Sequence, residues 1–482
     1  MKKRTKILAT IGPASDTLKQ IESLIKAGAN VFRLNFSHGT YEYHLDVLQK
    51  IRQASKNTGL IVGVLQDISG PKIRIGDLEH NFELKENDTI VFHKDTIVGK
   101  KTAEDKYEVS INCPEVLSQL HVDDYIYLYD GIIRTKVLTC SDTKVEVRVE
   151  NYGTLTSKKG VNFPNTELGV DVLTSKDRKD MAWGVENKVD FMAISFVQNA
   201  DDMLRARDII SNLGGKQMLI AKIEKFDAIK NIDAILKASD GLMVARGDLG
   251  IEVPYYEVPN LQKMLIHKAN FAAKPVITAT QMLLSMTHSE RATRAEISDI
   301  ANAVMDGTDA VMLSEESAIG NHPALAVQTM FETIRETEVA YAYHRTYNQV
   351  HTDVTNAIDE SAVKLAKDLN VDGILSMTAS GSSARKLAKY RPLQAIYAIT
   401  HSDIVRQQLT LSWGVVPAFN VEKSSFGKTI KDVMIKGLDR NILNKKYSYI
   451  LTAGDPVGVS GSTNTIRLLR ENEMEFFRTL GD

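Results

Sequence analysis

Charged side chains follow two apolar segments of this 482-residue chain, at the point where each segment ends. Lys222 and Glu224 lie at the end of Met218–Ile223, and because they are two residues apart they share one side of a strand. Asp248 follows the apolar segment Gly241–Ala245. If the two segments are neighbouring parallel strands, two carboxylates and an ammonium converge. Such carboxylates suit Mg²⁺, which completes its shell with substrate oxygens; an ion-pair cluster without a ligand is the alternative.

Short β-rich apolar segments recur along the chain, each followed by a helical pattern. Near-continuous apolar strands alternating with helices are typical of a closed parallel (β/α)₈ barrel, the TIM barrel, with an open doubly wound sheet as the lesser alternative. Functional groups of such barrels gather at the carboxyl ends of the strands. The eight segments are Thr5–Thr10, Asn30–Leu34, Leu60–Gln66, Asp190–Ile194, Met218–Ile223, Gly241–Ala245, Pro275–Ala279 and Asp309–Leu313.

The interval between the third and fourth segments is too long for one helix and a loop. Within it, Asp123–Tyr129, Ile132–Leu138 and Lys144–Glu150 alternate apolar and polar residues between turn signals, which is typical of antiparallel strands. We therefore predict a small β-barrel domain at 70–169, inserted into a catalytic barrel made of 1–69 and 170–343. An insert at the top of a barrel can close as a lid that excludes water.

The remaining segment, 344–482, is predicted to form an α/β domain. A helical pattern at Asn356–Leu369 precedes the strand Gly373–Met377, and a loop of small residues follows that strand. Such a loop offers backbone N–H groups and hydroxyls to a phosphate, although a helix cap is the simpler interpretation. A second small-residue loop, 458–464, favours a phosphorylated ligand. The residues of the two loops that could contact this ligand are Thr378, Ser380, Gly381, Ser382, Ser383, Gly461 and Ser462.

Polar residues end several other predicted barrel strands. Arg33 and Lys222 supply cations, and Thr280 and Ser314 supply hydroxyl groups. Cations and Mg²⁺ around one point are what phosphoryl transfer needs, because they neutralise the moving phosphoryl group and position donor and acceptor. The other polar residues at these ends are Asn35, Ser37, His38, Asp67, Thr278, Glu315 and Glu316.

Composition narrows the class of protein. With 59 basic and 61 acidic residues the formal net charge is -2, so no basic field indicates nucleic acid or an anionic membrane. No apolar stretch approaches the roughly 18 residues needed to span a bilayer. The two cysteines, Cys113 and Cys140, form neither a disulfide framework nor a zinc motif. We expect a cytoplasmic protein.

At the strand ends the sequence resembles the pyruvate kinase family, and the similarity extends over nearly the whole chain. The resemblance implies Mg²⁺-dependent phosphoryl transfer from phosphoenolpyruvate to ADP, giving ATP and pyruvate, the last step of glycolysis. It also implies an allosterically regulated homotetramer whose C-terminal domain binds a sugar phosphate or a nucleotide. The matching motifs are ATIGPAS (9–15), RLNFSHG (33–39), KIE (222–224), MVARGDLG (243–250), TATQM (278–282) and TRAEISDIANAVMDG (293–307).

The resemblance also implies roles for single residues. Glu224 and Asp248 would bind Mg²⁺. Lys222 would stabilise charge on the phosphoryl group and the enolate, Arg33 would hold the phosphate, and the backbone of Gly247 and Asp248 would approach the substrate carboxylate. A polar chain would deliver the proton to the enolate, through Thr280 with Ser314 and Glu316 behind it. The nucleotide would contact Asn35, Phe36, Ser37, His38, Arg74 and Lys159.

Lys72 departs from the family pattern, since many members have glutamate at its position. In those members a K⁺ ion is bound at the positions of Asn35, Ser37, Asp67 and the Ile68 carbonyl. The ammonium of Lys72 would supply that charge permanently and would repel K⁺. We therefore expect an enzyme that does not require K⁺.

Two other functions stay open. An Mg²⁺-dependent lyase that forms an enolate on the same barrel would carry similar residues but would need no nucleotide. A sugar-phosphate sensor with an inactive barrel would have lost Lys222, Glu224 or Asp248, and all three are present.

Overall fold

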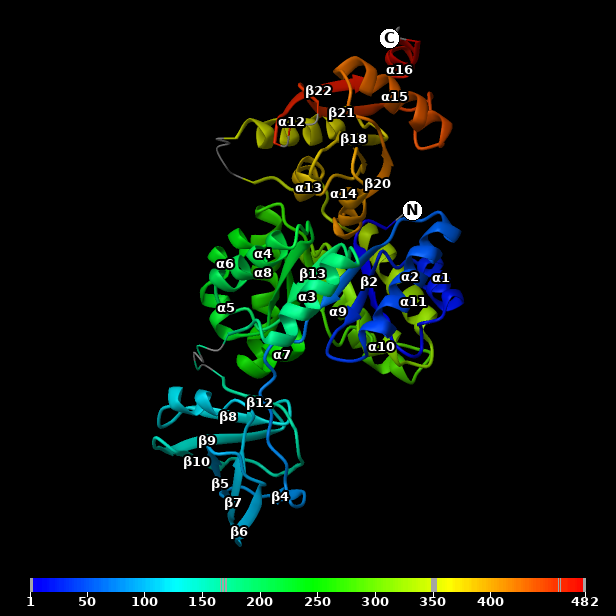
Figure 1. Ribbon diagram of the computed structural model, residues 1–482. Helices are drawn as coiled ribbons and strands as arrows, with labels where there is room; N and C mark the ends of the chain where they lie inside the picture. Colours follow the sequence, from blue (N-terminus) through cyan, green and yellow to red (C-terminus); the bar gives the residue numbers. More distant parts are fainter. Residues whose placement is uncertain are drawn as a thin grey trace.

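The computed structural model describes residues 3–164, 166, 169, 171–347, 353–457, 459 and 461–479. Three domains follow one another in space, with a β domain at one end, a barrel in the middle and an α/β domain at the other end (Figure 1). The three-domain architecture predicted from the sequence is confirmed. The domain boundaries themselves remain predictions, and residue 170, where one of them falls, lies outside the described residues.

Eight parallel strands close into the central barrel in the order β1-β17-β16-β15-β14-β13-β3-β2. Each predicted barrel strand is present, so the closed barrel is confirmed and the open doubly wound sheet is wrong. Their bounds are β1 Lys6–Thr10, β2 Val31–Asn35, β3 Gly63–Asp67, β13 Phe191–Ile194, β14 Met218–Ile223, β15 Gly241–Ala245, β16 Val276–Ala279 and β17 Ala310–Leu313.

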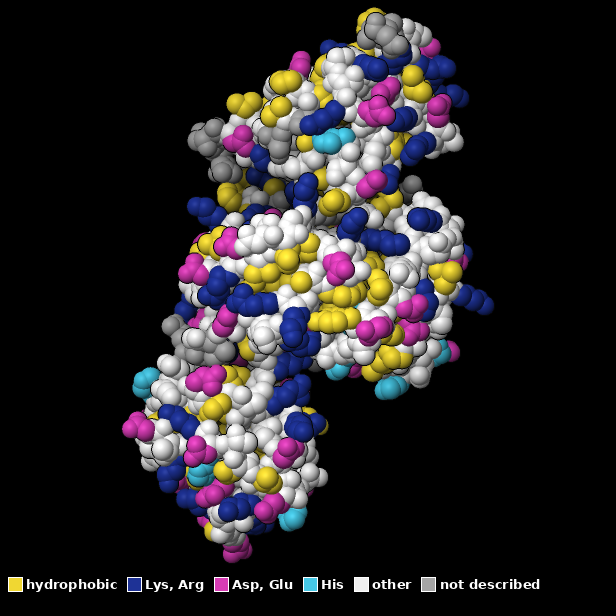
Figure 2. All heavy atoms as spheres, in the orientation of Figure 1, with side chains coloured by type: hydrophobic (Ala, Val, Ile, Leu, Met, Phe, Trp, Pro, Cys, Tyr) yellow, Lys and Arg dark blue, Asp and Glu magenta, His cyan; other side chains and the backbone are white. Residues whose placement is uncertain are grey.

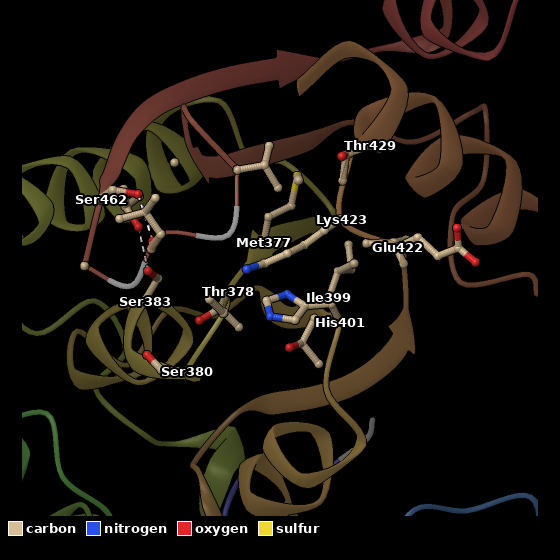
Figure 3. Close-up of a pocket in the computed structure, with 18 residues that line it drawn as sticks. Met377, Thr378, Ser380, Ser383, Ile399, His401, Glu422, Lys423, Thr429 and Ser462 are labelled. Carbon is tan, nitrogen blue, oxygen red and sulfur yellow. Dashed lines mark hydrogen bonds between the residues drawn. The ribbon is translucent and has the colours of Figure 1, made fainter. Parts of the chain in front are cut away.

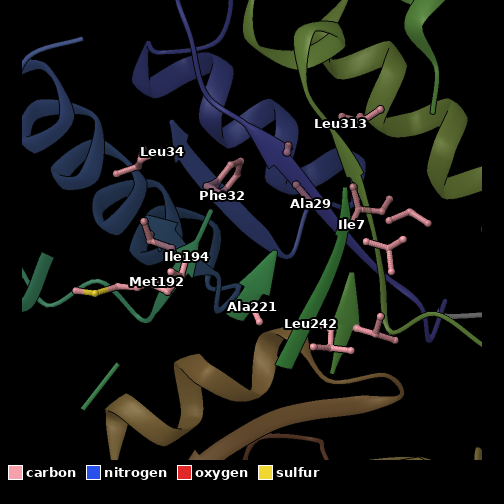
Figure 4. Close-up of a cluster of buried hydrophobic side chains, with 14 of the residues drawn as sticks. Ile7, Ala29, Phe32, Leu34, Met192, Ile194, Ala221, Leu242 and Leu313 are labelled. Carbon is pink, nitrogen blue, oxygen red and sulfur yellow. The ribbon is translucent and has the colours of Figure 1, made fainter. Parts of the chain in front are cut away.

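The barrel strands are apolar on both faces because both faces are covered. Ile7 and Phe32 point outward and join the cluster that packs under the surrounding helices (Figure 4). Leu8 and Val31, one residue along each strand, belong to the separate cluster of the barrel interior. The main surrounding helices are α1 Leu18–Ala27, α2 Tyr41–Thr58, α3 Ser175–Glu186, α4 Ala200–Asn212, α6 Ile232–Ala238, α8 Val258–Phe271, α9 Arg294–Asp306 and α11 Pro323–Val339.

The inserted domain is a curled seven-stranded sheet, in the order β12-β8-β9-β10-β5-β7-β6, with a two-stranded sheet of β11 and β4. The three segments that were predicted to be strands are β8, β9 and β10. The strand bounds are β4 Phe82–Leu84, β5 Thr89–His93, β6 Lys100–Ala103, β7 Lys106–Ser110, β8 Tyr125–Leu128, β9 Ile133–Cys140, β10 Lys144–Val149, β11 Gly153–Leu155 and β12 Val161–Asn162.

The C-terminal domain has a five-stranded sheet in the order β20-β19-β18-β21-β22. Four strands are parallel, and β22 is antiparallel to β21. In the described part of the chain, no helix is long and apolar enough to cross a membrane. The elements are α12 Val354–Asp368, β18 Gly373–Met377, α13 Ser382–Lys389, β19 Ala395–Thr400, α14 Asp403–Gln408, β20 Val415–Asn420, α15 Phe426–Asp439, β21 Tyr449–Gly454, β22 Thr463–Leu469 and α16 Glu471–Thr479.

Candidate active site

A chain of ion pairs crosses the end of the barrel from which the β domain is inserted. Arg33 Nε donates to Asp67 Oδ2 over 2.6 Å. Lys222 Nζ lies 3.1 Å from Asp67 Oδ1 and 2.9 Å from Glu224 Oε1. The four side chains come from the carboxyl ends of β2, β3 and β14, and all are nearly buried. The structure therefore brings Arg33, Lys222 and Glu224 together, as expected from the sequence.

The charges in this chain are mutually stabilised. Burial alone would raise the pKa of Asp67, but the Lys222 and Arg33 cations outweigh it and hold that pKa below its usual value. Burial likewise acts to lower the pKa of Lys222, and the Asp67 and Glu224 carboxylates reverse this and raise it. Lys222 is therefore a permanent cation at neutral pH, as stabilisation of a transferring phosphoryl group requires.

Asp248 completes the carboxylate pair. It lies in the first turn of α7, Arg246–Glu252, which begins directly after β15. Burial raises the pKa of both Glu224 and Asp248, and the Lys222 cation opposes this rise. Repulsion by the Asp248 carboxylate raises the pKa of Glu224 further. A divalent cation between them would remove this repulsion, so the oxygen donors fit Mg²⁺. Among the described residues no group of three or more His, Cys, Asp or Glu is placed to hold a metal ion.

Thr280 lies at the end of β16, where its backbone has a positive φ of 69°. Its hydroxyl accepts a hydrogen bond from Gly247 N at 2.9 Å and donates one to Ala279 O at 2.7 Å. Arg246 binds the same turn, because its Nη2 donates to Thr280 O at 2.7 Å while its Nη1 pairs with Asp299. These contacts hold a β-branched residue in a strained conformation beside Gly247, as expected at a functional site.

Glu316 lies under the strand ends. Its carboxylate accepts hydrogen bonds from Ser314 N at 2.7 Å and Leu283 N at 3.0 Å, and its side chain is buried. Both oxygens thus hold backbone segments in place. The structure gives Glu316 a positioning role, and its part and that of Ser314 in proton delivery remain predictions.

Two residues of the site were missed by the sequence analysis. Ser195 Oγ accepts a hydrogen bond from Lys222 Nζ at 2.7 Å and donates one to Ile68 O at 2.7 Å. Thr10 Oγ1 accepts one from Arg33 Nη1 at 3.1 Å. Ser195 directly follows β13 and Thr10 ends β1, so the rule that strand ends carry function would have found both.

Three of the four expected donors of a monovalent-cation site, those of Asn35, Asp67 and Ile68, have partners inside the protein. Asn35 Oδ1 accepts a hydrogen bond from Ser37 N at 3.2 Å, and the Ile68 carbonyl accepts the one from Ser195. Asp67 uses one oxygen for Arg33 and the other for Lys222. Each of these oxygens keeps a further lone pair, so the contacts do not by themselves exclude a K⁺ ion.

Lys72 borders the same cavity as Asp248, although much of its side chain is exposed. Burial of its ammonium and the Lys222 and Arg74 cations lower the pKa of Lys72, while Asp248 and Glu224 act in the opposite direction. Lys72 is therefore within electrostatic reach of both carboxylates.

The cavity, of about 300 Å³, lies between the barrel and the β domain, and Arg74 and Lys159 also line it. Arg74 Nη1 donates to Lys158 O at 2.9 Å, and Lys159 Nζ lies 3.9 Å from the centre of the Tyr129 ring. In Figure 2, Lys and Arg side chains gather along the notch between these domains. This volume and charge suit a phosphorylated ligand of metabolite size.

The other expected nucleotide residues, Asn35–His38, end β2 and begin the next turn, and they do not line this cavity. The Phe36 side chain is buried and stacks on His44, with ring centres 4.1 Å apart. Its carbonyl accepts hydrogen bonds from Ser69 Oγ and Lys176 Nζ. Phe36 thus has a structural role, whereas Ser37 and His38 are accessible.

A buried ion pair connects the end of β14 to α7, and a hydrogen bond to the same carboxylate reaches the β domain. Lys225, the residue after Glu224, lies 2.7 Å from Glu252 at the end of α7. Asn162 of β12 donates from Nδ2 to Glu252 Oε1 at 3.3 Å. One carboxylate thus links the two segments that carry Glu224 and Asp248 to the inserted domain.

A second candidate site lies in the C-terminal domain, at the carboxyl ends of β18 to β21. A cavity of about 40 Å³ is lined by five of the expected effector residues: Thr378, Ser380, Ser383, Gly461 and Ser462. Gly381 has a φ of 81° and precedes Ser382, the first residue of α13. Residues 458 and 460 of the second loop lie outside the described residues.

His401 and Lys423 also line this cavity and were not expected. Both point toward its Thr378 side (Figure 3). Burial and the neighbouring Lys423 ammonium lower the pKa of His401. A cation facing two small-residue loops is what a phosphate group requires.

Comparison with known proteins agrees with this geometry. The family model described as "Pyruvate kinase, barrel domain" matches residues 2–327, and "Pyruvate kinase, alpha/beta domain" matches 356–469. The pyruvate kinases of Geobacillus stearothermophilus and Bacillus licheniformis are 42% and 41% identical to this chain, over 97% of it and 80% of each relative. The crystal structure of a pyruvate kinase from Cryptosporidium parvum superposes with a TM-score of 0.89 at 34% identity, covering 97% of this chain and 96% of the other.

Proposed function

This chain belongs to the pyruvate kinase family, and from that premise we propose that it transfers a phosphoryl group from phosphoenolpyruvate to ADP with Mg²⁺ and without K⁺. The observation that carries the proposal is the ammonium of Lys222, held between Asp67 and Glu224 at the barrel mouth. Membership of a family of phosphotransferases excludes the lyase and the inactive sensor as the main function.

In this proposal each residue acts where its contacts place it. Glu224 and Asp248 would hold Mg²⁺, which when bound would supply positive charge beside the substrate. Lys222 neutralises charge that develops on the phosphoryl group and then on the enolate oxygen. Arg33 binds the phosphate from β2. The Thr280 hydroxyl relays a proton from water to the enolate, taking up one proton as it gives one, because alone it is too weak an acid.

Lys72 is proposed to replace K⁺. Its ammonium borders the same cavity as Asp248 and is within electrostatic reach of Asp248 and Glu224, so it supplies positive charge where K⁺ would otherwise do so. The test is pyruvate formation from phosphoenolpyruvate, ADP and Mg²⁺ in potassium-free buffer, followed by addition of KCl, for the wild type and for Lys72→Glu. We expect a full rate without KCl in the wild type and a rate that requires KCl in the variant. A wild type that depends strictly on KCl would refute the role of Lys72.

The C-terminal cavity is proposed to bind the phosphate group of an allosteric effector, either a sugar phosphate or a nucleotide. At about 40 Å³ it has room for a phosphate group rather than a whole sugar. In Ser382→Asp the new carboxylate lies at a helix start, where it stabilises α13 but repels phosphate. We expect this variant to lose activation by fructose 1,6-bisphosphate or AMP while Ser382→Ala keeps it. Activation that persists in Ser382→Asp would place the effector elsewhere.

The family resemblance also leads us to propose a homotetramer, which light scattering on the purified chain would test. Both cysteines are free thiols, which supports the cytoplasm as its compartment.

A further inference from the structure

A cleft of about 380 Å³ lies between the amino-terminal end of the barrel and the C-terminal domain. We name it the basal cleft, because the candidate active site is at the opposite end of the barrel strands. The barrel contributes Lys3, Arg4 and Lys6, and the C-terminal domain contributes Gln394 and apolar side chains that include Val371. Figure 1 shows the N-terminus of the chain beside the C-terminal domain at this junction.

The two lysines of the basal cleft are poorly neutralised. Lys6 Nζ donates to the carbonyl of Val415 at 2.7 Å, and Lys3 Nζ donates to the carbonyl of Thr5 and to the side-chain oxygen of Asn30. All three acceptors are uncharged. Within the described part of the chain, neither ammonium is within ion-pair distance of a carboxylate. Burying a cation without a charged partner is unfavourable unless an anion is supplied.

The carboxylates near the cleft are already engaged. Glu338 accepts hydrogen bonds from the backbone N–H groups of Arg4 and Thr5. Asp309 pairs with Arg391 of the C-terminal domain at 3.2 Å. Asp372, which lines the cleft, accepts a hydrogen bond from a backbone N–H group at 2.9 Å. None of them touches Lys3 or Lys6.

The titration behaviour of the lysines agrees with the contacts. Burial lowers the pKa of Lys6 to about 8, and the Glu338 and Asp309 carboxylates offset this only in part. Burial also lowers the pKa of Lys3, and repulsion by the Lys6 ammonium adds to it. The two ammonium groups are therefore close enough to repel each other.

Two buried polar atoms of residues that line the cleft lack a hydrogen-bond partner among the described residues. They are the Nε of Arg4, a donor, and the Oε1 of Gln394, an acceptor. The Arg4 guanidinium is held in place, since it stacks over the Tyr343 ring at 4.8 Å and donates to Leu393 O. Arg4 Nη1 already lies 4.0 Å from Glu338, so an anionic group would satisfy its remaining Nε, and a hydroxyl group of the same ligand would satisfy Gln394.

We propose that the basal cleft binds a small hydroxylated organic dianion, either a dicarboxylate or a phosphate monoester, between Lys3, Arg4 and Lys6. The cleft volume lies within the range of about 300–1,000 Å³ typical of small-molecule sites, and its apolar wall suits a short carbon skeleton. Because its walls belong to two domains, the bound dianion joins the barrel to the C-terminal domain. The site is distinct from the substrate and effector sites proposed above and does not depend on either assignment.

The test uses acylation of lysines in the wild-type chain, followed by peptide mass spectrometry. Malate and glycerol 3-phosphate are the probes, one for each class of dianion. A probe that protects the site, added at a free concentration of ten times its dissociation constant, should slow acylation of Lys3 and Lys6 roughly elevenfold. Exposed Lys56 is the internal control and should not change. This readout is local, so binding of glycerol 3-phosphate at other phosphate sites does not produce it.

Protection by malate alone identifies a dicarboxylate site, and protection by glycerol 3-phosphate alone identifies a phosphate monoester site. Equal acylation of Lys3 and Lys6 with and without both probes overturns the proposal. In calorimetric titrations with the protecting probe, Lys6→Met should lack the heat of binding at the basal cleft, and Lys56→Met should retain that heat. Slower acylation of Lys56 together with Lys3 in the presence of a probe would indicate general screening and would also overturn the proposal.

Discussion

Replacing Glu252 by glutamine should lower the stability of the barrel and raise the Mg²⁺ concentration needed for half-maximal activity. Glu252 ends α7, whose first turn carries Asp248, and its partner Lys225 follows Glu224 in the chain. The Lys225–Glu252 pair thus ties the two proposed metal carboxylates to each other. Without the carboxylate, α7 is held less firmly, and the separation of Glu224 and Asp248 becomes less well defined.

The size of the expected loss of stability in Glu252→Gln follows from the burial of the ion pair. Lys225 and Glu252 are 7% and 1% exposed, and their charged atoms are 2.7 Å apart. Removal of one partner leaves the other charge buried and costs about 3–5 kcal/mol. The glutamine oxygen can still accept the hydrogen bond of Asn162, so the loss is mainly electrostatic. In Lys225→Met combined with Glu252→Gln no charge remains, and much of the lost stability should return.

The assays are the apparent unfolding temperature and the Mg²⁺ concentration at half-maximal pyruvate formation. Asp233→Asn is the matched control, because the Lys268–Asp233 pair is 33% and 78% exposed and contributes only about 0–1 kcal/mol. The reasoning is refuted if Glu252→Gln unfolds at the temperature of this control and keeps the Mg²⁺ response of the wild type.

Three further outcomes are expected. Lys222→Met should reduce turnover by at least about 10²–10³ at temperatures where the variant is still folded, although loss of the pairs with Asp67 and Glu224 should also lower its unfolding temperature; retained turnover would refute its role. Arg391→Met should lower the free energy of unfolding by about 3–5 kcal/mol, because it breaks a buried ion pair with Asp309. A fall in unfolding temperature no larger than that of Arg335→Met, which removes an exposed ion pair, would contradict this. Burial raises the pKa of Asp190 from 3.8 to about 6, so the folded state keeps a proton that the unfolded state releases. The stability that Asp190 contributes therefore falls as pH rises from about 4 to about 6. The unfolding temperature of Asp190→Asn should accordingly rise relative to that of the wild type between pH 4 and 7. A difference between the two proteins that does not change with pH would contradict the raised pKa of Asp190.

The strand ends show how much of the site was readable from sequence. Lys222, Glu224 and Asp248 were predicted to converge because parallel strands place their carboxyl ends on one side of a barrel. The same rule was applied to only some of the strands, and Ser195 was missed although it directly follows β13. The nucleotide contact expected of Phe36 from its motif remains a prediction, and its stacking on His44 is a contact that no local pattern reveals.

By itself the sequence determined the order of elements, the closed barrel and the cationic and acidic groups at its mouth. These follow from short-range rules, because burial on both faces gives continuous apolar strands and the chain direction orders their ends. Only the tertiary structure decided the Lys225–Glu252–Asn162 link and the basal cleft with Lys6. Each of these joins residues from segments far apart in the chain, and the burial that sets their energies depends on how the domains pack.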